Sequence, residues 1–203
     1  NEMILRSNPT EETVEYAQDI QAASTLLLNQ VNDILDLSQM EMNKMQIIPV
    51  SYETKELFVS LAELIRGQAE KKNLELNLDI DKNLPSVLLG DEKRIRQVVL
   101  NILDNAVKYT EEGSVTLSVQ GEECSTEEVI LKIQIADTGI GIRKEEMDAI
   151  YDSFKRLDEK KNAQILGSGL GLAITRQLVN LMGGEISVDS IYTKGSVFTV
   201  ILK

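Results

Sequence analysis

The N-terminal part of the chain has the apolar pattern of a bundle helix. A heptad repeat runs through Ala17, Ile20, Ser24, Leu27, Val31, Ile34 and Ser38. A second apolar stripe lies beside it at Leu28, Leu35 and Met42. Two adjacent stripes form a wider face than a two-stranded coiled coil needs, and such a face predicts a helix of a four-helix bundle.

Capping residues predict where this helix begins and ends. Asn8 is expected to be the N-cap, with Pro9 at the first helical position and Glu11 completing a capping-box-like arrangement. Pro49 is expected to end the helical stretch, because proline cannot continue a helix. Asn1–Arg6 has the pattern of the middle of a helix, so we expect the end of a partner helix there and an excised fragment.

One helix and the end of another cannot close a bundle by themselves. The pattern therefore predicts a helical hairpin remnant over residues 1–48, which forms a homodimer through a four-helix bundle. The alternative is a helix that packs only on its own domain.

Beyond Pro49, helical and strand periodicities alternate. Helices are predicted at Thr54–Lys71, Asp91–Tyr109, Lys144–Phe154 and Leu170–Met182. Strands are predicted at Leu74–Ile80, Val115–Val119, Val129–Ala136, Glu185–Asp189 and Val197–Leu202. Adjacent hairpins mixed with helices imply an α+β two-layer sandwich, which we expect to span residues 49–203.

Charge and composition exclude several classes of function. The net charge of −12 argues against a nucleic-acid partner and against contact with an anionic membrane, since both require a basic surface. One cysteine and no histidine exclude an internal disulfide and a zinc site, and they agree with a cytoplasmic location. An anionic ligand would need local help from helix N-termini, a metal ion and a few cations.

One flank of the predicted Asp91–Tyr109 helix is polar. Asn101 and Asn105 lie one turn apart, and Lys108 and Tyr109 lie a further turn on. Two amides and an ammonium in one stripe can hold hydrated Mg²⁺ and polyphosphate oxygens, whereas the alternative is a solvated polar face. The remaining face should join the core, through Ile95, Val98, Ile102, Leu103 and Ala106.

Two glycine clusters follow, and each has an alternative explanation. Asp137, Gly139, Gly141 and Ile142 come after a strand, where Asp137 could accept the amino hydrogens of adenine, although an ordinary turn has the same pattern. The second cluster, Gly167, Gly169, Leu170 and Gly171, lies at the start of a predicted helix. Glycines at that position expose backbone N–H groups to phosphate, although a flexible hinge has the same pattern.

A charged segment without periodicity, Lys155–Leu166, separates the two glycine clusters. Phe154 and Leu157 could anchor it, and Arg156, Lys160 or Lys161 could reach phosphates. A mobile lid over a ligand is one interpretation, and a plain surface loop is the other.

The order of these motifs resembles one family. Asn-x-x-x-Asn-x-x-Lys-Tyr, Asp-x-Gly-x-Gly, Phe, Gly-x-Gly-x-Gly and the final Gly195-Ser-Val-Phe198 resemble the catalytic domain of sensor histidine kinases. That domain belongs to the ATPase superfamily shared with gyrase, HSP90 and MutL. Asn32–Ser38 also resembles the end of the second dimerisation helix, so the resemblance covers essentially the whole chain.

The resemblance implies binding of ATP and Mg²⁺. The implied ATP site comprises Asn101, Asn105, Lys108, Tyr109, Asp137, Gly139, Gly141, Ile142, Phe154, Arg156, Gly167, Gly169, Leu170, Gly171 and Thr199. Asn105 is implied to ligate Mg²⁺. Lys108 and Tyr109 are implied to face phosphate and ribose. Asp137 is implied to bind adenine, with Thr199 lining the base pocket.

The resemblance also implies a reaction and its partners. The γ-phosphoryl group of ATP would pass to a histidine on the first dimerisation helix, and then to an aspartate in the receiver domain of a response regulator. The hydrolysing relatives carry a glutamate where this chain has Asn101, so we expect slow ATP hydrolysis. With no histidine, the chain is expected to bind Mg-ATP without autophosphorylation, the acceptor lying about four helical turns upstream of Asn1.

Two other functions remain compatible with the sequence. An ATP-driven clamp of the gyrase or HSP90 type would turn over ATP rapidly, but leaves Asn8–Met45 unexplained. A nonenzymatic receptor module, whose longer parent also lacks the histidine, would act through dimerisation alone.

Overall fold

The computed structural model describes residues 10–123, 128–152 and 169–203. The chain divides into two compact units, Asn1–Met45 and Gln46–Lys203, which are described separately. Within the described ranges, no helix combines the length and apolarity needed to cross a bilayer.

The first unit contains one long helix, α2 (Glu11–Glu41). Thr10 is its N-cap: the residue is extended, with φ −66° and ψ 159°, and its Oγ1 accepts the Thr13 N–H at 3.3 Å. The predicted N-cap at Asn8 is therefore wrong, because the helix begins two residues beyond the predicted Pro9. The expected partner helix at Asn1–Arg6 lies outside the described residues.

The end of α2 also differs from the prediction. Helix α2 stops at Glu41, well before Pro49, because Asn43 takes a left-handed conformation with φ 51°. Asparagine tolerates this region better than most residues, and the Asn43 N–H then closes the last turn on the Met40 carbonyl at 2.9 Å. The predicted apolar face of α2 is exposed at Ile20, Leu27, Leu28, Val31, Ile34 and Leu35, as is Met42 at the C-cap, whereas Ala17 is buried.

The second unit is built on a five-stranded mixed sheet. Its strand order is β2 (Glu75–Ile80), β4 (Ser114–Glu123), β5 (Val129–Asp137), β7 (Gly195–Leu202) and β6 (Glu185–Ile191). Strands β2 and β4 run parallel, and every other neighbouring pair is antiparallel. The predicted closing pair, β6 and β7, is confirmed.

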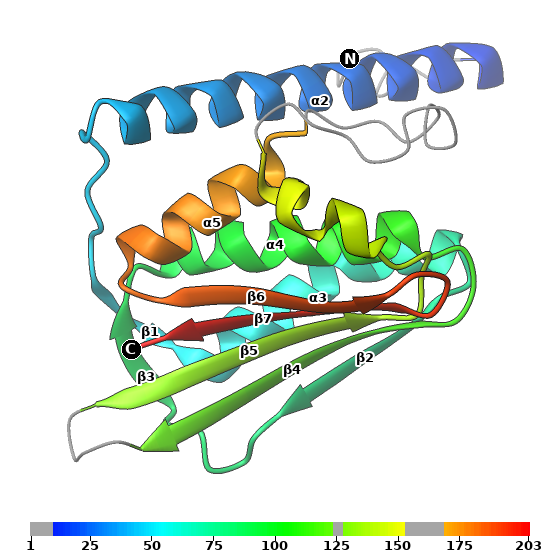
Figure 1. Cartoon of the computed structure of the whole chain (residues 1–203). Coiled ribbons are helices and arrows are strands. Elements are labelled where there is room, and N and C mark those ends of the chain that lie inside the picture. The colour runs from blue at the N-terminus through cyan, green and yellow to red at the C-terminus, as the bar shows by residue number, and fades with distance from the viewer. Residues whose placement is uncertain (1–9, 124–127, 153–168) are drawn as a thin grey trace. The chain divides into compact units, whose positions relative to one another are not determined.

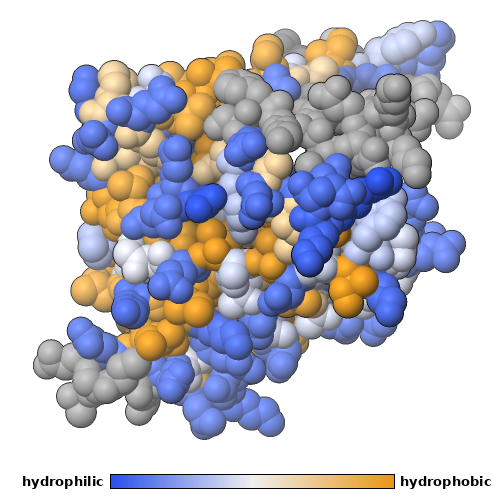
Figure 2. Space-filling view, in the orientation of Figure 1, coloured by the Kyte–Doolittle hydropathy of each residue, from blue (hydrophilic) through white to orange (hydrophobic). Residues whose placement is uncertain are grey.

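Helices cover one face of this sheet. They are α3 (Thr54–Lys71), α4 (Glu92–Tyr109) and α5 (Gly171–Leu181), and Figure 1 shows all three on the same side of the strands. The expected α+β two-layer sandwich is therefore confirmed. Hydrophilic residues occupy much of the surface in view, interrupted by apolar patches (Figure 2), as the net charge of −12 leads one to expect.

The core lies between the two layers. The predicted inner face of α4 is confirmed as buried, at Ile95, Val98, Ile102, Leu103 and Ala106. Against it pack the fully buried Leu117, Ile133 and Ile135 of the sheet. Side chains alternate along a strand, so Asp137 falls on the same helix-covered face as Ile133 and Ile135.

Two short elements were not predicted. Strands β1 (Val50–Glu53) and β3 (Val87–Gly90) pair antiparallel in a separate two-stranded sheet. Each is too short to show a period in the sequence, and the pairing is long-range. The segment predicted as a helix at Lys144–Phe154 is a 3₁₀ helix, η1 (Lys144–Tyr151), and its N-cap residue Arg143 provides no side-chain cap.

Candidate functional site

Helix α4 presents the polar flank that the sequence predicts. Asn101, Asn105, Lys108 and Tyr109 are all half-buried, whereas the opposite flank is fully buried. Half-burial beside a packed core leaves these amides and the ammonium partly accessible to a ligand or to solvent.

Asp137 lies at the end of β5, where the sheet meets the helices. The strand register places it directly opposite Ser196 of β7 and Val115 of β4. Its Oδ1 accepts the Gly139 N–H at 2.9 Å. Burial raises the pKa of the Asp137 carboxyl group, and backbone N–H bonds from Gly139 and Ser196 oppose that rise.

The loop after Asp137 packs on the last turn of α4. The Ile140 N–H donates to the Tyr109 carbonyl at 3.1 Å. A Cβ at Gly139 would lie 2.4 Å from that same carbonyl oxygen, so only glycine permits this approach. The contact brings Asp137 and Tyr109 together, although they are distant in the sequence.

The same loop is hydrogen-bonded to the β6–β7 hairpin. Gly141 has φ +63°, and a Cβ there would lie 2.2 Å from the Ile191 carbonyl oxygen. The half-buried Ile142 donates its N–H to Ser190 Oγ at 2.8 Å, and the Thr193 N–H donates to the Ile140 carbonyl at 2.7 Å. Bonds on both sides of Gly141 therefore set the position of the loop.

Asn101 joins α4 to the start of α5. Its Nδ2 donates to the Gly171 carbonyl and to Thr175 Oγ1, each at 3.4 Å. A carboxylate at this position could not donate either bond and would face the Gly171 carbonyl oxygen. The carboxamide therefore has a structural role besides any role toward a ligand.

The second glycine cluster is described only in part. Gly169 has φ +70°, Leu170 is buried, and Gly171 begins α5 close to Asn101. Of these residues, Gly171 is brought to the α4 flank, at Asn101. Phe154, Arg156 and Gly167 lie outside the described residues, as does the predicted lid.

Thr199 is not brought to Asp137. It lies directly opposite Gln134 on the sheet face away from the helices, where Gln134 Nε2 donates to its Oγ1 at 3.2 Å. Alternation along β7 instead places Ser196 beside Asp137. Sequence reasoning missed Ser196 and Ser190, because their positions depend on the β5–β7 and β6–β7 registers, which only the structure gives.

Lys72 was also missed, and it completes the C-terminus of α4. Its Nζ donates to the carbonyls of Val107 at 2.9 Å, Lys108 at 2.8 Å and Thr110 at 3.1 Å. Every helix leaves its last carbonyls without intrahelical partners. The ammonium satisfies those beside the polar flank and opposes the negative end of the helix dipole.

We expect Lys72→Met to lower the free energy of unfolding by about 1–2 kcal/mol, because the carbonyls of Val107 and Lys108 lose a charged donor at an exposed site. Denaturant titration measures this loss. The adjacent exposed Lys71→Met is the control and should change stability by less than about 0.5 kcal/mol. Equal losses in the two variants would contradict the capping role.

The loop after Asp137, residues 138–142, is called the glycine loop below. A shallow hollow of about 250 Å³ lies beside it. It is lined by Glu111, Glu112, Thr138, Gly139, Ile140, Tyr192 and Thr193. Two glutamates make this hollow unfavourable for a triphosphate, so we place no nucleotide phosphate there.

Comparison with known proteins agrees with this geometry. Residues 90–203 match the family described as "Histidine kinase-, DNA gyrase B-, and HSP90-like ATPase". Hybrid signal transduction histidine kinase A of Dictyostelium discoideum is 37% identical over 212 residues, covering 100% of this chain and 10% of that protein. Signal transduction histidine-protein kinase BarA of Escherichia coli (strain K12) is 32% identical, covering 97% of this chain and 21% of that protein.

Solved structures give the same result. The full-length structure of ShkA in complex with AMPPNP matches with a TM-score of 0.80 and 29% identity, over 97% of this chain and 40% of that one. The chain thus spans a small part of the curated relatives that it matches. Since the family match covers more than half of its residues and its relatives are sensor histidine kinases, the chain belongs to the histidine kinase-, DNA gyrase B- and HSP90-like ATPase family.

Proposed function

We propose that this chain is the ATP-binding catalytic portion of a sensor histidine kinase. It transfers the γ-phosphoryl group of ATP to a histidine on a dimerisation helix, for relay to an aspartate of a response regulator. The observation that carries the proposal is the convergence of Asp137, the polar flank of α4 and the start of α5 in one unit. The similarity to ShkA, solved with AMPPNP, supports ATP as the nucleotide.

Asp137 is the proposed adenine ligand. Its carboxylate lies partly buried at a strand end and is oriented by the Gly139 N–H. An ionised carboxyl group accepts hydrogen bonds only, which suits the exocyclic amino group of adenine. Close packing of the glycine loop on Tyr109 keeps this acceptor in place without a bulky neighbour.

The phosphates would lie between α4 and the start of α5. Lys108 supplies positive charge, and the N–H groups around Gly169 and Gly171 supply the positive end of α5. Phe154, Arg156 and Gly167 remain proposed contributors from the segment outside the described residues. These local donors are needed because the chain as a whole carries a charge of −12.

The donor chemistry of α4 fits Mg²⁺. Among the described residues, no group of three or more carboxylate or cysteine side chains could hold a metal ion. Magnesium commonly keeps several waters and binds through one or two protein oxygens plus substrate phosphates, so the Asn105 amide oxygen would be sufficient. The ion would neutralise charge on the phosphate oxygens.

Asn101 directs the chemistry toward transfer rather than hydrolysis. An amide cannot take a proton from water at neutral pH, and the Asn101 nitrogen is already engaged with Gly171 and Thr175. The bond between the γ-phosphorus and the bridging oxygen to the β-phosphate breaks, a bond to a histidine ring nitrogen forms, and ADP leaves. Positioning and charge neutralisation then supply most of the catalysis.

The second part of the proposal concerns dimerisation through α2, the helical stem. The exposed apolar face of α2 would pair with a second copy in a dimeric four-helix bundle, over residues 1–48. Residues 49–203 would form the catalytic domain, in a cytoplasmic setting. The acceptor histidine would lie outside these 203 residues, which contain none.

Transfer to a separate stem tests this function. The chain is mixed with labelled ATP, magnesium and a stem polypeptide in which α2 is preceded by the histidine-bearing helix. We expect acid-labile label on that histidine and little release of free phosphate. Rapid ATP turnover without label transfer would favour a gyrase-type clamp. Absence of transfer, despite ATP binding and a formed heterodimer, would reject the kinase proposal.

We expect Asn105→Ala to weaken ATP binding more in the presence of magnesium than in its absence, because the variant removes the proposed metal ligand from α4. A loss of about tenfold with magnesium and of about twofold without it corresponds to one hydrogen-bond-sized contact. Calorimetric titrations in magnesium and in EDTA measure both values. Equal losses under the two conditions would contradict a metal role.

A further inference from the structure

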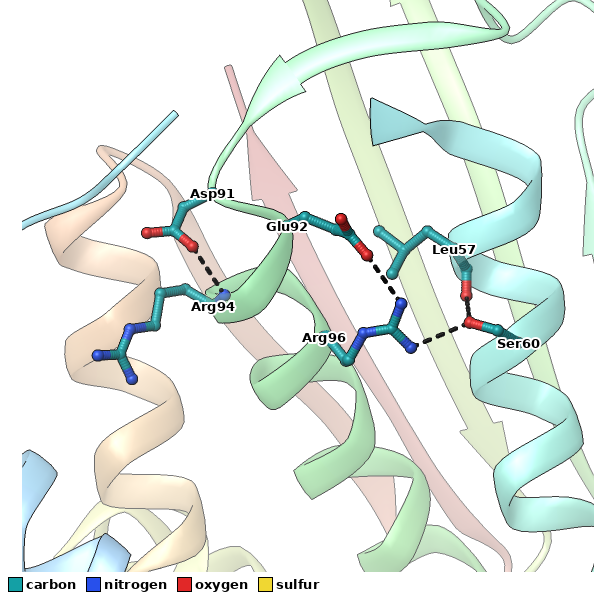
Figure 3. A network of polar contacts seen from close by, with 6 residues as sticks. All are labelled: Leu57, Ser60, Asp91, Glu92, Arg94 and Arg96. Atoms are coloured by element: carbon teal, nitrogen blue, oxygen red, sulfur yellow. Dashed lines mark hydrogen bonds and ion pairs between the residues drawn. The ribbon is translucent and has the colours of Figure 1, made fainter. Parts of the chain in front are cut away.

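The Asp91 carboxylate joins two parts of the second unit. Its Oδ1 accepts the Arg94 N–H at 3.1 Å and so caps α4, as Figure 3 shows. Its Oδ2 accepts the Ile48 N–H at 2.9 Å. The side chain is 7% exposed, so both bonds are largely shielded from water. Capping requires one oxygen, and the second oxygen is therefore available to hold residue 48.

The connector, residues 44–47, leads from the end of α2 to Ile48, which lies near the start of the second unit. The Lys44 N–H still bonds to the Gln39 carbonyl, at 2.9 Å, as part of the end of α2. Met45, Gln46 and Ile47 follow before the bond from Ile48 to Asp91. The Ile48 side chain is 66% exposed, so apolar burial does not fix this residue. Its backbone N–H bond is the contact that holds it.

The helix that receives this bond is itself firmly placed. Arg96 bonds Glu92 at 2.8 Å and Ser60 of α3 at 3.0 Å, and Ser60 donates to the Leu57 carbonyl at 2.7 Å (Figure 3). Further along, α4 carries Asn101 and Asn105. The point where the connector joins the second unit is thus attached to the same helix that carries the proposed phosphate-facing side chains.

We propose that Asp91 is a positioning residue for phosphoryl transfer, because its second oxygen ties the connector to α4 at Ile48. This inference rests on the proposed kinase function. Its role is to shorten the segment between α2 and the ATP-binding unit, rather than to bind the nucleotide.

The length of the free connector explains the expected effect. Without the Asp91 bond, the next backbone pairing is that of Val50 with Gly90 in the β1–β3 sheet. Ile48 and Pro49 would then lengthen the connector by about 7 Å of extended reach. Phosphoryl transfer needs the reacting atoms within about 3–3.5 Å of each other in a defined alignment. A longer tether lowers the population of that arrangement.

Asp91→Asn separates the two roles of the carboxylate. The amide oxygen still caps α4, since asparagine is as good an N-cap as aspartate, but the amide nitrogen cannot accept the Ile48 N–H. Asp91→Ser, which also caps with a single oxygen, serves as a second variant. Asp79→Asn is the matched control, because it makes the same change of carboxylate to carboxamide at an exposed position of β2 and leaves Asp91 intact.

Three measurements are made on the full chain: ATP affinity, the rate of transfer to the histidine-bearing stem at saturating ATP, and trypsin cleavage after Lys44. For Asp91→Asn we expect affinity within about twofold of the original protein and a transfer rate about tenfold lower. Cleavage after Lys44 should be about threefold faster, because a released connector is more accessible to protease. Asp79→Asn should change none of the three.

Two results would overturn the inference. Unchanged transfer despite faster cleavage would show that the connector is held but does not position the unit, and slower transfer with unchanged cleavage would show that Asp91 acts by another route. If the original chain transfers no phosphate at all, the kinase proposal fails, and an unchanged cleavage rate in Asp91→Asn would reject the tether separately.

Discussion

Asp137→Asn is expected to abolish measurable ATP binding while the domain stays folded. The asparagine oxygen can still accept the Gly139 N–H, but the amide nitrogen would meet the amino group of adenine, and two donors cannot bond to each other. Losing one charge-assisted hydrogen bond costs about 1.5–3 kcal/mol, so together with the unpaired donor we expect affinity to fall by about a hundredfold or more. Calorimetric titration measures it.

Asp79→Asn is the matched control for this substitution. Asp79 lies on β2 of the same sheet but is exposed, and the same change of carboxylate to carboxamide there should leave ATP affinity unchanged. Circular dichroism of both variants should match the original protein. Unchanged affinity in Asp137→Asn would reject the adenine assignment.

The raised pKa of Asp137 adds a stability prediction to the same variant. Because burial raises the folded-state pKa of Asp137 above the ordinary aspartate value, the folded protein binds this proton more tightly than the unfolded chain does. Ionised Asp137 therefore contributes a destabilising effect that appears as pH rises above the ordinary aspartate pKa and is complete once pH exceeds the raised folded-state pKa. Asp137→Asn should gain stability relative to the original protein between acidic and neutral pH. Denaturant titrations at both pH values test this sign, and a relative loss would contradict it.

Gly141→Ala is expected to destabilise the second unit and weaken ATP binding together. At φ +63° an alanine is strained, and its Cβ would lie 2.2 Å from the backbone oxygen of Ile191, which cannot rotate away. Moving the loop would break the bonds from Ile142 and Thr193 that hold it to the hairpin. We expect a loss of about 3 kcal/mol or more in the free energy of unfolding, measured by denaturant titration.

Gly183→Ala separates strain from collision. Gly183 also has a positive φ, +73°, but nothing lies within 4 Å of a Cβ built there. The control should therefore cost only about 1–2 kcal/mol and leave ATP affinity unchanged. If the two variants lose equal stability, the collision with Ile191 is not what makes Gly141 necessary.

The helices of the second unit could be predicted because each buries a continuous apolar face. Thr54–Lys71 was predicted with the observed bounds of α3, and the inner face of α4 was predicted except for Val99 and Val107. Local periodicity carries that information when burial is one-sided. The predicted ends of α2 were wrong. Thr10 competes with Asn8 as the N-cap, Asn43 competes with Pro49 as the terminating residue, and the apolar pattern does not rank these candidates.

Part of the candidate site could be predicted for a similar reason. Asn101 and Asn105 share a flank by helical spacing alone, and Asp137 follows its strand directly. Thr199 and Ser196, in contrast, could not be assigned to a sheet face before the β5–β7 register was known. A shift of one residue in pairing exchanges the two faces of a strand.

The sequence by itself determined the α+β class, the polar flank of α4, the family resemblance and the carboxamide at Asn101, because these follow from short-range spacing and residue chemistry. Only the tertiary structure decided that Lys72 completes the end of α4, that Asp91 holds Ile48, and that the glycine loop rests on Tyr109. Those contacts join backbone groups to partners distant in the chain. Almost every residue carries the same backbone N–H and carbonyl groups. The hydrogen-bond partner of such a group is therefore set by how whole helices and strands pack, and it cannot be predicted from the residue type.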